Sequence, residues 1–198
     1  MKATHRADIF TFSRFDPVRN VDFNGWFLVR EDGNVLVDPV EMSEHDIAHA
    51  RELGGVAWIV ITNSDHVRAA PQLAEVFHAN VAGPAAEREG FPVACDRWLA
   101  GGDAAFSGIE IVALAGSKTP GELALVVDGD TLVTGDLVRA HRGGGIHLLP
   151  DAKLVDRDAA MASLRALTEQ HHLRAVLVGD GWPLFADAHA HLDRMLET

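Results

Sequence analysis

The residues with the clearest chemical potential are Asp65 and His66, which follow the polar tripeptide Thr62-Asn63-Ser64. A carboxylate beside an imidazole can ligate a divalent metal ion or hold a polar ligand. Three more ionisable residues stand in turns after apolar stretches, namely Lys118, Asp136 and Asp180. Because these positions span more than half of the chain, only the tertiary fold can bring them together.

The elements around Asp65 and His66 predict where that turn lies. Residues 56–61 are a continuous apolar run rich in β-branched side chains, which is typical of a strand buried on both faces. The segment Ala69 to His78 is helix-like, with Pro71 tolerated in its first turn. A strand, a polar turn and a helix place Asp65 and His66 at the carboxyl end of a central strand, where α/β sheets usually bind ligands.

The rest of the chain alternates strands and helices in two rounds. The turn Glu31-Asp32-Gly33-Asn34 predicts a hairpin, and Ser43 with Asp46 predicts the start of a helix that ends at Gly54-Gly55. We expect further strands at 9–15, 26–29, 35–37, 81–83, 109–114, 123–127, 131–134 and 174–178. Further helices are expected at 84–90, after Asp156 or Asp158, and along Phe185, Ala188, Leu192 and Met195, with irregular segments at 91–108 and 138–150. This order predicts a four-layer α/β/β/α sandwich in a single domain covering residues 1–198.

Four short segments resemble motifs of the metallo-β-lactamase-fold superfamily, in the order that the family has them. The segment from Ile61 to His66 is similar to its T-H-x-H-x-D-H turn, with the final D-H intact. Lys118-Thr119-Pro120-Gly121 resembles H-T-P-G, Thr134-Gly135-Asp136 resembles the G-D aspartate, and Gly179-Asp180-Gly181 resembles G-H-G. The resemblance runs from about Asn24 to the end of the chain, and it implies the same four-layer sandwich.

The resemblance also implies a two-metal site, of which this sequence retains only one half. The first metal would need Ile61, Asn63 and Lys118, which offer a hydrocarbon, a weak amide ligand and a repelling ammonium. The second would be held by Asp65, His66, Asp136 and Asp180, an oxygen-rich set that suits Mn²⁺, Fe²⁺, Mg²⁺ or Zn²⁺. We therefore expect at most one divalent metal ion (Zn, Mn or Fe) as cofactor, and the alternative is none.

Lys118 admits two interpretations, and so does the acidic quartet. Its ammonium could replace the first metal by holding Asp136 and Asp65 together and polarising a substrate carbonyl, or it could form an ion pair that freezes an inactive site. Asp65 could equally cap the following helix, and Asp136 could bind loop amides.

Other polar residues give weaker signals. Asn63 is expected on the wall of the pocket, and His141 and His147 flank Gly143-Gly144-Gly145, so these three residues are candidates for substrate binding. Arg68 and Arg139 are nearby positive charges that could hold an anionic substrate. The segment from His45 to His49 imitates H-E-x-x-H, but no third ligand follows, so we interpret it as a solvated helix face.

Composition excludes several classes of function. The 198 residues carry 17 basic and 29 acidic side chains, a net charge of −12, which argues against a nucleic-acid partner. The single cysteine, Cys95, cannot form an intrachain disulfide, and no apolar run reaches the ~18 residues of a membrane span. We expect a soluble cytoplasmic protein that contacts no membrane.

Two function hypotheses follow. The first is a divergent hydrolase acting on an unknown small molecule, with Asp65 and Lys118 in catalysis, a metal-bound water as nucleophile, and Lys118 with Asn63 polarising the scissile bond. The second is a catalytically inactive, metal-free pocket protein that binds a ligand or partner. The sequence does not name the substrate, because a fold does not fix a function.

Overall fold

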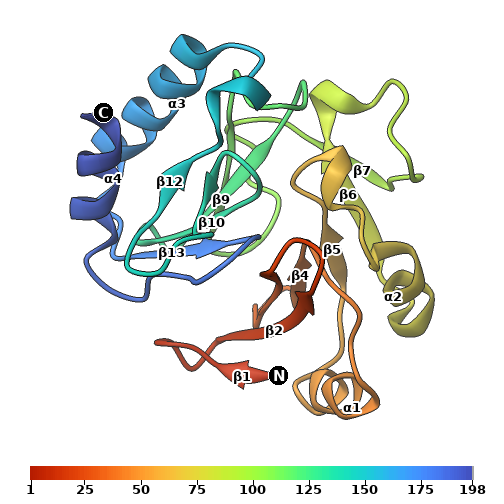
Figure 1. Ribbon diagram of the computed structural model, residues 1–198. Coiled ribbons are helices and arrows are strands. Elements are labelled where there is room, and N and C mark those ends of the chain that lie inside the picture. Colours follow the sequence, from red (N-terminus) through yellow and green to blue (C-terminus); the bar gives the residue numbers. More distant parts are fainter. Residues whose placement is uncertain (198) are drawn as a thin grey trace.

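The computed structural model describes residues 1–197, which form two main β-sheets with helices on their outer faces (Figure 1). The first sheet begins antiparallel, from β1 to β4, and continues in parallel through β7. Its seven strands lie side by side in chain order: β1 (Lys2–Ala3), β2 (Ile9–Asp16), β3 (Val21–Leu28), β4 (Val35–Val37), β5 (Trp58–Val60), β6 (Asn80–Pro84) and β7 (Arg97–Leu99).

The second sheet has four strands in the order β13-β10-β9-β8. These are β8 (Ile109–Ala113), β9 (Leu123–Val127), β10 (Thr131–Thr134) and β13 (Ala175–Val178). Within this second sheet, β10 and β13 pair in parallel, and the other two pairs of strands are antiparallel. A small separate ribbon, β11 (Val138–Arg139) with β12 (His147–Leu148), lies in the segment after β10.

Three apolar clusters separate the layers. The middle cluster, which includes Trp26 and Leu125, is built from residues of both sheets and fills the space between them. A second cluster joins the first sheet to α1 (Glu44–Glu52) and α2 (Ala70–Phe77), and a third joins the second sheet to α3 (Arg157–Gln170) and α4 (Ala188–Leu196). The predicted four-layer α/β/β/α sandwich is therefore confirmed, with α1 and α2 on one side and α3 and α4 on the other (Figure 1).

Local sequence signals set the ends of these helices. Ser43 and Asp46 form the expected capping box, and Asp156 caps α3 by accepting a hydrogen bond from the Ala159 amide. At the other end of a helix, His78 terminates α2 by adopting the left-handed conformation. Within residues 1–197, no helix is long and apolar enough to cross a membrane.

Several predicted elements differ from the observed ones. The segments 91–108 and 138–150, expected to be irregular, contain the short strands β7, β11 and β12, whose two or three residues are too few to show alternation. The helix expected at 84–90 is only a 3₁₀ turn at Ala85–Glu87. Phe185, expected on the C-terminal helix, precedes α4, because Asp187 adopts a left-handed conformation that starts the helix at Ala188.

The two sheets are joined directly beside the candidate site. The buried Asn24 side chain donates from Nδ2 to the carbonyl oxygens of Val178 and Gly181, at 3.0 and 2.7 Å. Its backbone amide donates to the Gly179 carbonyl at 2.8 Å. These bonds fix the turn that carries Asp180 against strand β3.

Candidate functional site

The polar turn after β5 places Asp65 and His66 at the carboxyl end of that strand. Asn63 caps the 3₁₀ turn Ser64–His66 by accepting a hydrogen bond from the Asp65 amide at 3.0 Å. As a result the His66 side chain is buried between the sheets, whereas the side chain of Asp65 is 55% exposed. The two neighbours therefore have different environments and different partners.

Lys118, Asp136 and Asp180 arrive from the second sheet. Lys118 lies in the connection between β8 and β9, Asp136 follows β10, and Asp180 follows β13. The Lys118 ammonium lies 2.7 Å from the Asp65 carboxylate and 2.8 Å from that of Asp136. The expected proximity of Lys118 to these two acids is thus confirmed.

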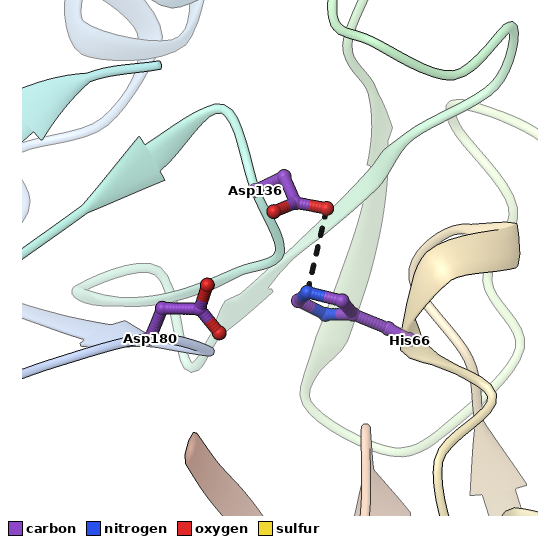
Figure 2. A group of neighbouring side chains, drawn as sticks. All are labelled: His66, Asp136 and Asp180. Atoms are coloured by element: carbon purple, nitrogen blue, oxygen red, sulfur yellow. Dashed lines mark ion pairs between the residues drawn. The ribbon is translucent and has the colours of Figure 1, made fainter. Parts of the chain in front are cut away.

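His66, Asp136 and Asp180 converge from three distant segments, and Figure 2 shows their side chains directed toward one another. One ligand atom from each can be chosen so that all lie within 4.8 Å of one another. His66 Nε2 is 3.4 Å from Asp136 Oδ2. Asp65 is not a member of this group among the described residues, because its carboxylate is turned toward Lys118.

Two arginines form further ion pairs with the carboxylates of Asp136 and Asp180. The Arg68 guanidinium lies 2.8 Å from Asp180, and that of Arg139 lies 2.9 Å from Asp136. We call the following residues the site cluster: the carboxylates Asp38, Asp65, Asp136 and Asp180 with the cations His66, Arg68, Lys118 and Arg139. With His66 protonated, the four cations and the four carboxylates of the site cluster carry equal and opposite charge.

Asp38 is a site residue that sequence analysis did not single out. It accepts hydrogen bonds from the backbone and hydroxyl of Thr62, at 2.8 and 2.6 Å, and lies 2.7 Å from His66 Nδ1. Its backbone φ of 46° is unusual for a residue other than glycine. The only sequence signal was its place before Pro39 at the end of a strand.

Ion pairing within the site cluster shifts the pKa values of His66, Lys118 and Asp136. Burial and Arg68 lower the pKa of His66, but Asp38 and Asp136 outweigh them and raise it to about 9. Burial favours the neutral form of Asp136, yet His66 and Lys118 hold the pKa of this carboxyl well below its usual range. Burial lowers the pKa of Lys118, but Asp136 and Asp65 raise it on balance. At neutral pH, His66 and Lys118 are therefore cations and Asp136 is an anion.

A cavity of about 1000 Å³ opens above the site cluster. Asp65, His66, Arg68, Lys118, Asp136 and Asp180 form its charged floor. The apolar part of its walls comes from the β2–β3 hairpin (Phe15, Phe23), the segment before α1 (Val40, Met42) and helix α2 (Leu73, Val76). The charged residues Arg14, Asp16, Arg19 and Glu41 also line the walls. Such a cavity is large enough for a small organic molecule.

The three residues expected to bind substrate do not line this cavity. The Asn63 side chain is fully buried, caps its own turn and lies against Gly135. His141 approaches Asp180 from another side, with Nε2 at 3.5 Å from Oδ2. The ring centroid of His147 lies 5.9 Å from that of His141, and His147 lines a separate cavity of about 420 Å³.

The comparisons agree with this architecture. The family model of the metallo-beta-lactamase superfamily matches residues 1–198, so the chain belongs to that superfamily. No curated protein matches the chain in sequence.

Solved structures with the same fold include two that are named as metal-bound forms. A metallo-beta-lactamase from Erythrobacter litoralis is 15% identical with a TM-score of 0.72, covering 98% of this chain and 89% of that one. FIM-1 from Pseudomonas aeruginosa, in its mono-zinc form, is 12% identical with a TM-score of 0.74, covering 99% and 93%. TTHA1623, in a di-iron-bound form, is 24% identical with a TM-score of 0.67, covering 91% and 98%. At these identities the likeness establishes the fold alone.

The residues present can be tested against the metals that the family implies. At the first position, Ile61 has no donor atom, Asn63 is engaged in its turn and Lys118 is a cation. At the second, the group His66, Asp136 and Asp180 has suitable donors, but every member already faces Arg68, Arg139 or Lys118. A divalent ion would have to enter beside these cations, so the site as arranged does not fit a resident metal.

Proposed function

We propose that this chain binds a small organic molecule in the cavity above the site cluster, without a resident catalytic metal. The observation that carries the proposal is the bridging position of Lys118, whose ammonium contacts both Asp65 and Asp136. Positive charge at the base of the cavity is therefore supplied by the chain itself. Asp65 and Lys118, the residues expected in catalysis, become polar contacts for the ligand.

The chemistry of the cavity supports an uncharged or amphipathic ligand. The floor is electrically balanced, so it offers hydrogen-bonding groups but little net charge to attract an ion. The walls offer apolar area from Phe23, Met42 and Leu73. A ligand would bury its apolar part against these walls and direct a polar group toward Lys118, which remains 24% exposed.

A direct test uses the fluorescent probe 8-anilinonaphthalene-1-sulfonate and two substitutions on helix α2. Gln72 lines the cavity and Glu75 does not, although both residues lie on the same helix. Gln72→Trp should narrow the cavity and weaken probe binding, whereas Glu75→Trp should leave it unchanged. Equal binding by both variants would place the probe elsewhere and contradict the proposal.

A metal-dependent hydrolase is the second candidate, and one observation favours it. The ligand atoms of His66, Asp136 and Asp180 lie within 4.8 Å of one another, close enough to converge on one ion. Such an ion would supply Lewis acidity beside the cavity. Stoichiometric Zn, Mn or Fe in protein purified from supplemented medium, measured by mass spectrometry, would favour this candidate over the metal-free pocket.

A further inference from the structure

The Arg68 guanidinium lies among the atoms that would otherwise ligate a metal. Its NH2 group is 3.3 Å from His66 Nε2 and 2.8 Å from Asp180 Oδ1. It therefore contacts two of the three residues whose ligand atoms converge. A guanidinium is permanently charged and offers several donors in one plane, so it binds the Asp180 carboxylate as a fixed cation and excludes a second cation from the position beside His66.

Arg68 is held in this position from behind. Its NH1 group donates to the carbonyl oxygens of Asn24 and Asp38, at 2.8 and 3.1 Å, and NH2 also approaches the Gly179 carbonyl at 3.3 Å. The side chain is only 12% exposed. Its backbone has a φ of 44°, a conformation that residues other than glycine rarely adopt. The guanidinium is thus fixed by backbone atoms of both sheets and is not a mobile surface charge.

Asp136, the third residue of this group, also pairs with cations. Asp136 Oδ1 lies 2.9 Å from Arg139, and Oδ2 lies 2.8 Å from Lys118. Removing Lys118 would leave Arg68 between His66 and Asp180, whereas removing Arg68 would take the guanidinium away from both of those residues at once. Arg68 is therefore the cation whose loss changes the ligand set most.

We propose that Arg68 closes a latent metal site formed by His66, Asp136 and Asp180. The guanidinium takes the place of the ion, and the site admits a divalent cation once that side chain is shortened. This inference does not depend on small-molecule binding, because it concerns only the floor of the cavity. It predicts a gain of metal binding from the loss of one positive charge.

The test is calorimetric titration of ZnCl₂ and MnCl₂ into metal-stripped protein. Wild type should show no specific uptake, and Arg68→Ala should bind about one equivalent of at least one of the two ions, as a site with one imidazole and two carboxylates permits. Arg68→Lys retains a cation and should stay without uptake. Arg19→Ala is the matched control, because Arg19 also lines the cavity and also stacks on Phe23.

Two further variants keep the outcome decisive. Adding Asp180→Asn to Arg68→Ala should abolish the uptake, which assigns the ion to this group. If Arg68→Ala does not fold, Arg68→Met retains the aliphatic stem and should gain uptake instead. Stoichiometric binding by wild type, or no binding by a folded Arg68→Ala or Arg68→Met protein, would overturn the inference.

Discussion

Two clusters of ion pairs within residues 1–197 join distant segments, and they differ in the burial of most of their carboxylates. The outer cluster consists of Arg6, Asp8, Arg30, Asp128 and Asp130, and it links the start of the chain to the turn between β9 and β10. Its Asp8 and Asp128 side chains are 32% and 37% exposed, whereas Asp136 in the site cluster is 2% exposed. Water can replace a lost partner of Asp8 or Asp128 but not one of Asp136.

This difference shows why similar ion pairs have different consequences. Exposed pairs contribute little to stability, because solvent and salt screen them. A buried carboxylate that loses its partner keeps the full cost of desolvation. The site cluster is therefore the region in which single substitutions should affect both the fold and the cavity.

The largest effect is expected for Lys118→Ala. This change takes the ammonium away from the buried Asp136, which keeps Arg139 and His66 as partners, and it should lower the free energy of unfolding by on the order of 3 kcal/mol. Urea unfolding followed by circular dichroism measures the change. An unaltered midpoint would mean that Lys118 contributes no more than an exposed lysine.

A pH effect of similar size is expected from His66. Its pKa is about 9 in the folded protein, against 6.5 for an unperturbed histidine, so its stabilisation is fully present below pH 6.5. That stabilisation is lost as the pH rises through 9, on the order of 3 kcal/mol in total. Unfolding free energies measured from pH 7 to 9.5 should fall in wild type and stay nearly flat in His66→Gln. A slope that persists in the variant would assign the effect to another group.

A smaller effect on stability is expected at Gly179, whose backbone packs against the His66 ring. A Cβ atom at Gly179 would lie 2.7 Å from His66 Cε1, so Gly179→Ala should displace the imidazole and cost roughly 1–3 kcal/mol. Gly143→Ala is the control, because its nearest neighbour, Trp182, would lie 3.9 Å away. Melting temperatures should fall for the first variant only, and equal values would contradict the close packing.

The smallest effect is expected in the outer cluster. Arg6→Ala removes ion pairs with partly exposed aspartates and should cost less than about 1 kcal/mol, and the loss should shrink further in high salt. Chemical unfolding at two ionic strengths would measure this. A loss as large as that of Lys118→Ala would remove the distinction between the two clusters.

The sequence predicted the parts of this architecture that depend on local signals. The buried strand before Thr62 and the capping box at Ser43 were predicted from such signals. The resemblance of the ordered motif fragments led us to expect Lys118 beside Asp65 and Asp136, as observed. Contacts set by long-range geometry were not predictable. Arg68 was expected to hold an anionic substrate, but its left-handed backbone, which no local pattern indicates, turns it onto Asp180. Asn63 was expected on the pocket wall, but its side-chain oxygen instead accepts a hydrogen bond from the Asp65 amide and caps its own turn.

The bonds from Asn24 to Val178 and Gly181 also bear on when the site is completed during biosynthesis. They join residues 154 and 157 positions apart, and Asp180 lies between the two acceptors. Contacts of such separation form late, because a long stretch of chain must be ordered before they can close. The first sheet can begin to assemble while the ribosome is still adding residues, but the floor of the cavity cannot. A nascent chain therefore holds Arg68 without its partner Asp180 until the strand β13 arrives.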